Sequence, residues 1–279
     1  MTPECVWQVE TELGEGPLWV ASEQALWFVD IKKNHIHCFD PASGTGRTYD
    51  TPQSPGFIVE RNGEFLVGLK SGIHRFDPAR NTYTLLHAID ADRPDNRLND
   101  GALDAQGRLW FGTMDDNEAD PTGSLYRLDA DGPKKMDTGI CITNGPCFSP
   151  DGGTLYHTDT LGKTIYAFDA AKDGSLSNKR VWVRIEDGAG YPDGPVTDRE
   201  GCVWTGLFGG WAARRYDPQG KLVSTVTFAC ANITKLAFGG PDLKTVYATT
   251  AWKGLDESAR SRQPLAGGLF RFESEVAGL

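Results

Sequence analysis

The chain has 279 residues, and its 28 Lys and Arg against 38 Asp and Glu give a formal net charge of −10. A chain this acidic, with no basic stripe, is poorly suited to nucleic acid or to an anionic membrane, so we expect no partner of either kind. The 33 Gly and 16 Pro lie in no low-complexity run and predict many turns, hence many short strands.

The first residues, Met1 to Trp7, carry neither the basic region nor the apolar region of a secretion signal. No stretch reaches the roughly 18 consecutive apolar residues of a membrane span. Six cysteines occur without a Cys-x-x-Cys pair or zinc-ribbon spacing, which favours buried thiols in a reducing compartment. We therefore expect a cytoplasmic location and a monomer.

One motif recurs along the chain. Each copy pairs an apolar run with a second run that ends near an Asp or Phe, over residues 25–44, 65–78, 109–129, 155–169, 203–218 and 246–272. The central residues of the first runs are Trp27, Leu66, Trp110, Tyr156, Trp204 and Tyr247, spaced by 39, 44, 46, 48 and 43 residues. A period in the forties with alternating apolar and polar residues is typical of propeller blades.

The sequence therefore predicts an all-β fold, a six-bladed β-propeller with four antiparallel strands per blade, and residues 1–279 as a single domain. A sandwich or an open solenoid would not need so even a repeat. Runs of the form Asp-x-x-Gly at residues 104–107, 198–201 and 217–220 predict tight turns between strands. Residues 129–132 imitate the start of a calcium loop but lack its twelfth-position Glu, so we expect a hairpin turn there.

A further strand precedes each of these runs, where the innermost strand of a blade belongs. These strands cover residues 14–19, 54–59, 99–104, 143–148, 191–196 and 233–238. Five contain a Gly near their start, and the residues before it are Glu15, Pro55, Asp100, Asn144 and Asp193; the sixth has Thr234 followed by Lys235. Because the blades surround one axis, these positions are expected to converge.

The oxygen donors at these positions predict a cation site. Glu15, Asn144 and Asp193 suit one hard divalent ion with water completing its coordination, and each is followed by Gly-Pro, which lets the backbone approach the axis. Any one of these dipeptides alone would be read as a turn. Asp100 shares the register, and the nearby Arg97 is either a binder of substrate oxygens or one half of a surface salt bridge.

Other catalytic patterns are missing from the sequence. The five histidines, including His157, fall in strand-like runs and are expected to pack rather than to catalyse. No His-Glu-x-x-His motif occurs, so a zinc peptidase is not expected. No Gly-x-Ser-x-Gly motif occurs, so a serine esterase is not expected either.

Five ordered motifs resemble the regucalcin/gluconolactonase family of sugar lactonases. They are Leu-Gly-Glu-Gly-Pro-Leu-Trp at 13–19, Arg-Leu-Asn-Asp-Gly at 97–101, Phe-Gly-Thr-Met at 111–114, Thr-Asn-Gly at 143–145 and Pro-Asp-Gly at 192–194. Residues 141–147 and 157–166 look most like the bacterial pentonolactonase branch, which includes xylonolactonases. The resemblance implies a six-bladed propeller with one divalent metal ion in its channel.

The resemblance also implies roles for single residues. Family metal ligands correspond to Glu15, Asn144 and Asp193, and family substrate contacts to Arg97 and Asn99. The acidic substrate contact that follows the Gly-Thr-Met motif falls at Asn117, a departure for which Asp116 or Glu118 could substitute. Likeness to xylonolactonases favours Fe(II) as the metal, with Ca(II), Zn(II), Mn(II) or Mg(II) as alternatives.

The activity that follows is hydrolysis of an aldonolactone, such as xylono-, arabinono- or glucono-lactone, to its aldonic acid. The cation would polarise the lactone carbonyl, Asp193 would act as general base, and Arg97 and Asn99 would position the sugar. One alternative is a non-catalytic propeller of regucalcin type that binds calcium or a partner protein. Another is a lactonase acting on acyl-homoserine or aromatic esters, which would need an apolar pocket.

Overall fold

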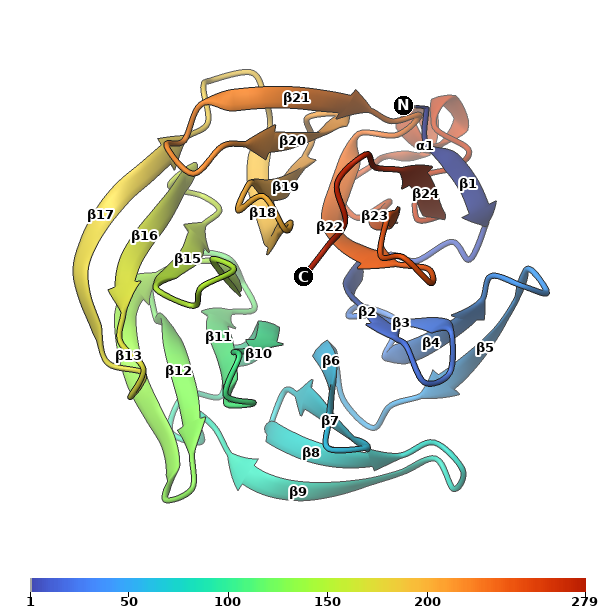
Figure 1. The fold of residues 1–279 in the computed structure, drawn as a ribbon. Coiled ribbons are helices and arrows are strands. Elements are labelled where there is room, and N and C mark those ends of the chain that lie inside the picture. Colours follow the sequence, from blue (N-terminus) through green and yellow to red (C-terminus); the bar gives the residue numbers. More distant parts are fainter. Residues whose placement is uncertain (1) are drawn as a thin grey trace.

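The computed structural model describes residues 2–279, and it is an all-β propeller whose sheets surround a central axis (Figure 1). Four sheets have four strands each, paired antiparallel in sequence order. Their strands are β2 (Gly14–Val20), β3 (Ala25–Asp30), β4 (His35–Asp40) and β5 (Thr45–Asp50); β6 (Pro55–Arg61), β7 (Glu64–Leu69), β8 (Gly72–Asp77) and β9 (Thr82–Ala88); β10 (Asn96–Leu103), β11 (Leu109–Asp115), β12 (Gly123–Asp129) and β13 (Gly132–Ile140); and β14 (Thr143–Phe148), β15 (Thr154–Asp159), β16 (Thr164–Ala170) and β17 (Leu176–Arg184).

The remaining strands form one continuous eight-stranded sheet of order β1-β24-β23-β22-β18-β19-β20-β21. They are β1 (Glu4–Trp7), β18 (Tyr191–Thr197), β19 (Val203–Phe208), β20 (Ala212–Tyr216), β21 (Leu222–Thr227), β22 (Asn232–Gly239), β23 (Thr245–Ala251) and β24 (Leu269–Glu273).

The prediction of six separate blades of four antiparallel strands is therefore wrong, because only four such blades are present. The inner strands β18 and β22 run parallel and pair at Gly194 and Lys235, and this pairing joins the other eight strands into one sheet. A Cβ atom on Gly194 would lie 2.6 Å from Cδ of Lys235. The missing side chain is what allows the two strands to approach so closely.

The two ends of the chain meet in this large sheet. Strand β1 pairs antiparallel with β24, and Leu13 bridges to Ala251, so residues from the beginning of the chain complete the edge built by its end. The one helix of the described residues, α1 (Glu257–Arg262), begins at Asp256, whose side chain accepts a hydrogen bond from the Ala259 amide. No helix within residues 2–279 is long and apolar enough to cross a bilayer.

The repeated residues of the sequence form the packing between sheets. Trp27, Trp110, Trp204 and Tyr247 are among the largest fully buried side chains, and each lies in the second strand from the axis. Burial of large apolar side chains in this way stabilises the fold by roughly 1.5–3 kcal/mol each. The predicted tight turns are present as well, since Gly107, Gly201 and Gly220 have φ of 73°, 80° and 82°.

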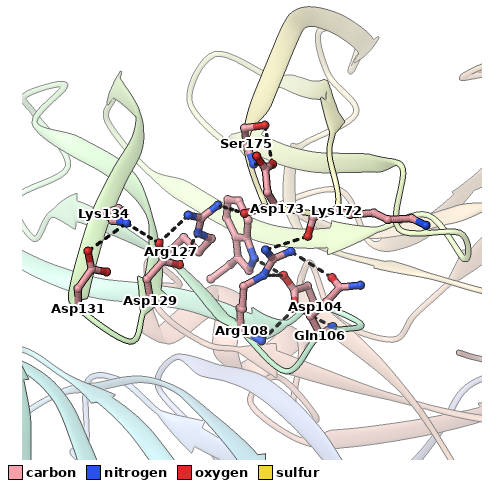
Figure 2. Close-up of polar contacts among 11 residues, drawn as sticks. Asp104, Gln106, Arg108, Arg127, Asp129, Asp131, Lys134, Lys172, Asp173 and Ser175 are labelled. Atoms are coloured by element: carbon pink, nitrogen blue, oxygen red, sulfur yellow. Dashed lines mark hydrogen bonds and ion pairs between the residues drawn. The ribbon is translucent and has the colours of Figure 1, made fainter.

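Polar side chains also connect neighbouring sheets. Arg127 donates to both carboxylate oxygens of Asp129 at 2.6 Å and to the carbonyl oxygen of Asp173, in the next sheet, at 3.0 Å (Figure 2). Arg108 makes the equivalent link, donating to Asp104 at 2.6 Å and to the Lys172 carbonyl at 3.2 Å. Each guanidinium therefore joins its own sheet to the loop between β16 and β17.

Candidate functional site

The innermost strands carry a local distortion at the positions predicted for the site. The pairing register shifts between Glu15 and Leu18 in β2, between Asn144 and Cys147 in β14, and between Pro192 and Pro195 in β18. Gly16 and Gly145 have φ of 54° and 84°, which a glycine adopts at low cost. A bulge of this kind redirects the neighbouring side chain, so the Gly-Pro pairs turn Glu15, Asn144 and Asp193 toward the axis.

The structure brings most of the predicted site residues to one place. Glu15, Asn144, Asp193, Arg97, Asn99 and Glu118 all line a single cavity of about 260 Å³. Its apolar walls come from Leu13, Met114, Ile142, Leu161, Tyr191 and Phe208. Asn117 does not line this cavity: it is exposed, and its side-chain amide donates to Asp115 at 3.3 Å. Of the substrate contacts predicted at this loop, Glu118 lines the cavity and Asn117 does not.

Two buried carboxyl groups lie side by side in the cavity. Glu15 and Asp193 are 3% and 6% exposed, and each is close enough to the other to affect its ionisation. Burial, with the added repulsion of Asp100, raises the pKa of Glu15 to about 7. Burial also raises the pKa of Asp193 well above its usual value, and the charge of Glu15 adds to this effect. Two such groups together need a positive partner if both are to be ionised.

Asn144 is held by a network of buried amides and hydroxyls. Its Nδ2 atom donates to Oγ1 of Thr160 at 2.9 Å, and its Oδ1 atom accepts from Nδ2 of Asn99 at 3.1 Å. Asn99 also donates to the Thr143 carbonyl at 2.6 Å and accepts from Arg97 at 2.6 Å. Because each side chain fixes the next, the Asn144 amide oxygen is oriented before any ligand arrives.

Arg97 is a buried residue of the cavity and not half of a surface salt bridge. Its side chain is 2% exposed, and Nε donates to Oδ1 of Asp116 at 2.8 Å. Lys32 donates to the same carboxylate at 2.8 Å. Although burial opposes the shift, the bond from Lys32 and the charge of Arg97 lower the pKa of Asp116. The Asp116 carboxylate therefore fixes the guanidinium in place at the edge of the cavity.

Behind the site, Asp100 and Lys235 form a buried ion pair. Asp100 also accepts from the Gly101 and Gly145 amides, each at 2.7 Å, and Gly145 directly follows Asn144. Burial alone would lower the pKa of Lys235, but the neighbouring Asp100 carboxylate more than offsets this and raises it. Lys235 also lines a second cavity, of about 620 Å³, built from the later residues of the same inner strands.

The donor set fits a hard cation. Within the described residues 2–279, no three His, Cys, Asp or Glu side chains are arranged to hold a metal ion by themselves, so the candidate ligands are two carboxylates and one amide. An oxygen-only set suits hard divalent ions and not ions that require thiolates. Since Lys235 is already paired with Asp100, the Glu15–Asp193 pair is the place where a counter-charge is needed. Glu15, Asn144 and Asp193 therefore fit a divalent metal ion on chemical grounds.

The remaining sequence predictions concern histidines and cysteines. All five His residues lie outside the cavity lining, and burial lowers the pKa of His157 to about 4 and that of His37 to about 3. Neither ring nitrogen of His157 has a hydrogen-bond partner, which fits a packed, neutral imidazole. The six cysteines are free thiols; four are buried, as predicted, whereas Cys5 and Cys141 are half-buried.

Sequence analysis missed Lys253, Thr160, Tyr191 and Phe208, which also line the cavity. A signal for three of them exists. Phe208 ends the second strand of its blade, and Thr160 and Lys253 follow such a strand directly or after one residue. In an antiparallel pair the start of one strand and the end of its neighbour lie at the same edge, so these residues lie beside the start of the innermost strand.

Comparison with known proteins identifies the family. Residues 13–252 match the family described as SMP-30/gluconolactonase/LRE-like region. The chain belongs to this family. It is 32% identical to the 6-deoxy-6-sulfogluconolactonase of Pseudomonas putida, over 99% of this chain and 96% of that protein. It is 31% identical to a pentonolactonase of Haloferax volcanii, over 100% of this chain and 96% of that protein.

Among solved structures, the chain is similar to regucalcin from Agrobacterium tumefaciens, described as a calcium-binding protein. The TM-score is 0.95 at 29% identity, covering 99% of this chain and 94% of that one. The family expected from the sequence motifs is therefore confirmed, and the chain covers 94–96% of the length of these three relatives.

Proposed function

We propose that this protein is a metal-dependent sugar lactonase that hydrolyses an aldonolactone to its aldonic acid. The observation that carries the proposal is the pair of buried carboxyl groups, Glu15 and Asp193, beside an oriented Asn144 amide in a small cavity that also holds Arg97. The relatives named as lactonases support the same class of reaction. A cavity of about 260 Å³ is small for a binding site and suits a single sugar ring.

Glu15, Asn144 and Asp193 are the residues that would hold the metal. When bound, a divalent cation supplies Lewis-acid stabilisation of the negative charge that develops on a lactone carbonyl oxygen, worth several kcal/mol. Likeness to pentonolactonases favours Fe(II), and the all-oxygen donor set also suits Mn(II), Mg(II), Zn(II) or Ca(II).

The chain's own residues position the substrate and move the proton. Arg97 donates to sugar oxygens from a guanidinium that Asp116 holds in place, and Asn99 is fixed beside it. Asp193 accepts a proton from the attacking water, whose oxygen bonds to the carbonyl carbon. The ring C–O bond then breaks, and the leaving alkoxide takes up the proton that Asp193 accepted, which gives the open hydroxy acid and restores the carboxylate. No covalent nucleophile is needed, because a lactone is an activated ester.

The test is hydrolysis by purified, chelator-treated protein supplied with Fe(II), Mn(II), Zn(II), Mg(II) or Ca(II). Xylono-, arabinono- and glucono-lactones are offered, and acid release is followed with a pH indicator against the spontaneous rate. Metal-dependent acceleration on at least one lactone is expected. Failure to accelerate any of them with any of the ions would refute the enzymatic proposal.

Asp193→Ala is the matched variant. It should abolish metal binding and hydrolysis together while unfolding at a temperature no lower than the wild type, because it removes one of two mutually repelling buried carboxyl groups. Asp187→Ala is the control, since Asp187 is exposed and pairs with Lys163 at 2.8 Å outside the cavity lining. Full activity in Asp193→Ala would contradict the assigned role.

The second candidate function is calcium binding without catalysis. It is favoured by the description of the Agrobacterium protein as calcium-binding and by the oxygen-only donor set. It predicts that Ca(II) binds the wild type and not Asp193→Ala, while no lactone is hydrolysed faster than in buffer. The same panel of ions and lactones therefore separates the two functions.

A further inference from the structure

A second ion pair lies at the cavity, and no step of the proposed reaction uses it. Lys253, two residues beyond the end of β23, pairs with Glu118, three residues beyond the end of β11. Both residues line the cavity that contains Glu15 and Asp193. Their side chains are 28% and 33% exposed, so the pair lies where the cavity opens toward solvent.

Glu118 lies in a loop whose backbone is fixed by its own hydrogen bonds. Asp115 holds this loop in shape, because its carboxylate accepts from the amides of Asn117, Ala119 and Asp120 at 3.0–3.1 Å. The φ of Glu118 is 57°, a left-handed value that ten other non-glycine residues of the described chain also adopt.

Lys253 is also presented by a fixed backbone. Its amide donates to the Glu12 carbonyl at 2.9 Å, and its carbonyl accepts from Nδ2 of Asn232 at 3.0 Å. Both loops are therefore fixed without help from the ion pair. A partly exposed pair whose only role was to tie the two loops together would add only about 0–1 kcal/mol.

The pair offers the hydrogen-bonding groups that a polyol needs. An ammonium group has three donors and a carboxylate has about four acceptor sites, so each keeps free capacity after pairing with the other. A sugar hydroxyl both donates and accepts, and adjacent hydroxyls can engage Lys253 and Glu118 together. The rest of the cavity wall near its mouth is apolar, with Leu161, Tyr191 and Phe208, and offers a hydroxyl few alternatives.

We propose that Lys253, placed beside the expected substrate contact Glu118, is a specificity-determining residue that selects polyhydroxylated lactones over unsubstituted lactones. This inference rests on the proposed lactonase function. Lys253 binds ring or side-chain hydroxyls remote from the carbonyl, and Glu118 accepts from the same hydroxyls. Neither residue takes part in attack on the carbonyl carbon, so an unsubstituted lactone of the same ring size does not use them.

The experiment compares Lys253→Met with the wild type on matched lactones. Glucono-1,5-lactone is paired with δ-valerolactone, and xylono-1,4-lactone with γ-butyrolactone. We expect kcat/KM on the hydroxylated lactones to fall about 10- to 100-fold, mainly through a higher KM, because hydrogen bonds to charged groups are lost. Rates on the unsubstituted lactones stay at the wild-type level. Thermal unfolding is measured in parallel.

Lys179→Met is the matched control, because Lys179 forms a partly exposed ion pair with Asp137 at 2.5 Å on outer strands, away from the cavity. It should leave both classes of lactone unaffected. An equal loss on hydroxylated and unsubstituted lactones in Lys253→Met would assign the pair a structural role and overturn the inference. No loss on either class would overturn it as well.

Failure of the proposed function gives a different result. If the wild type hydrolyses no lactone, calorimetry tests the inference separately. It compares the binding of 1,5-anhydroglucitol, a hydroxylated ring, with that of tetrahydropyran, the same ring without hydroxyls. Preference for 1,5-anhydroglucitol that disappears in Lys253→Met supports it. A wild type that binds both rings equally, or neither, overturns it.

Discussion

Replacing Lys235 by Met tests whether the ion pair behind the site is a structural requirement. The side chains of Lys235 and Asp100 are 9% and 1% exposed, so the free-energy cost typical of disrupting a buried ion pair applies, and not the smaller cost for a surface pair. Removing one partner of a buried pair costs about 3–5 kcal/mol, because the other charge is left uncompensated. The Gly101 and Gly145 amides still donate to Asp100, which places the expected loss near the lower end, about 3 kcal/mol.

The double variant Asp100→Asn/Lys235→Met removes both charges and keeps the volume. It should lie within about 1–2 kcal/mol of the wild type, since neutral replacements of a buried pair are often tolerated and one backbone hydrogen bond is lost. Unfolding in urea with a chelator present, followed by fluorescence of the eight Trp residues, gives the free energies. A stable Lys235→Met protein, or a double variant as unstable as the sum of the single ones, would refute this reasoning.

Three further predictions concern the packing and the edge of the cavity. Burial lowers the pKa of His157 in the folded state to about 4, below its unfolded value of about 6.5, so the wild type loses stability as the pH falls from about 6.5 toward 4. Between pH 7 and pH 4, the free energy of unfolding of His157→Leu should therefore fall by about 3 kcal/mol less than that of the wild type, as measured by urea unfolding. Gly56→Ala should destabilise the fold by about 1–3 kcal/mol in the same assay, since its Cβ would lie 2.4 Å from the Leu98 carbonyl oxygen. Asp116→Asn should raise KM for sugar lactones more than it lowers kcat, because Arg97 loses its charged partner.

Each of these three predictions has a result that would contradict it. A pH profile identical in wild type and His157→Leu would show that His157 is not buried as a neutral ring. A Gly56→Ala protein as stable as the wild type would show that β6 and β10 can move apart. Asp116→Asn with unchanged KM would show that Arg97 does not contact the substrate.

The position of the strands was predictable from the sequence, because apolar alternation and turn residues are local signals. The inner strand predicted at 143–148 is β14, Thr143–Phe148, and the one predicted at 191–196 is β18 with one more residue. The arrangement of the strands into sheets was less predictable from the sequence. The parallel pairing of Gly194 with Lys235 depends on how closely two inner strands approach, and no repeat in the sequence encodes that distance.

The site followed from the sequence only where residues shared a register. Glu15, Asn144 and Asp193 precede equivalent glycines and do reach one cavity. The ion pairs between distant residues could not be predicted in this way. Asp100 pairs with Lys235 and Glu118 pairs with Lys253, and the members of each pair are 135 residues apart in the chain. Asn117 and Glu118 are adjacent, yet Glu118 lines the cavity and Asn117 does not, a difference that no local pattern in the sequence indicates.

Stoichiometric metal titration of the chelator-treated protein tests the central proposal most directly. Bound metal per chain is measured by mass spectrometry in parallel with the rate of sugar-lactone hydrolysis. We expect the rate to rise in proportion to bound metal, to level off at about one ion per chain, and to stay at the spontaneous value in Asp193→Ala. Hydrolysis that is equally fast without metal, or that persists in Asp193→Ala, would contradict the account.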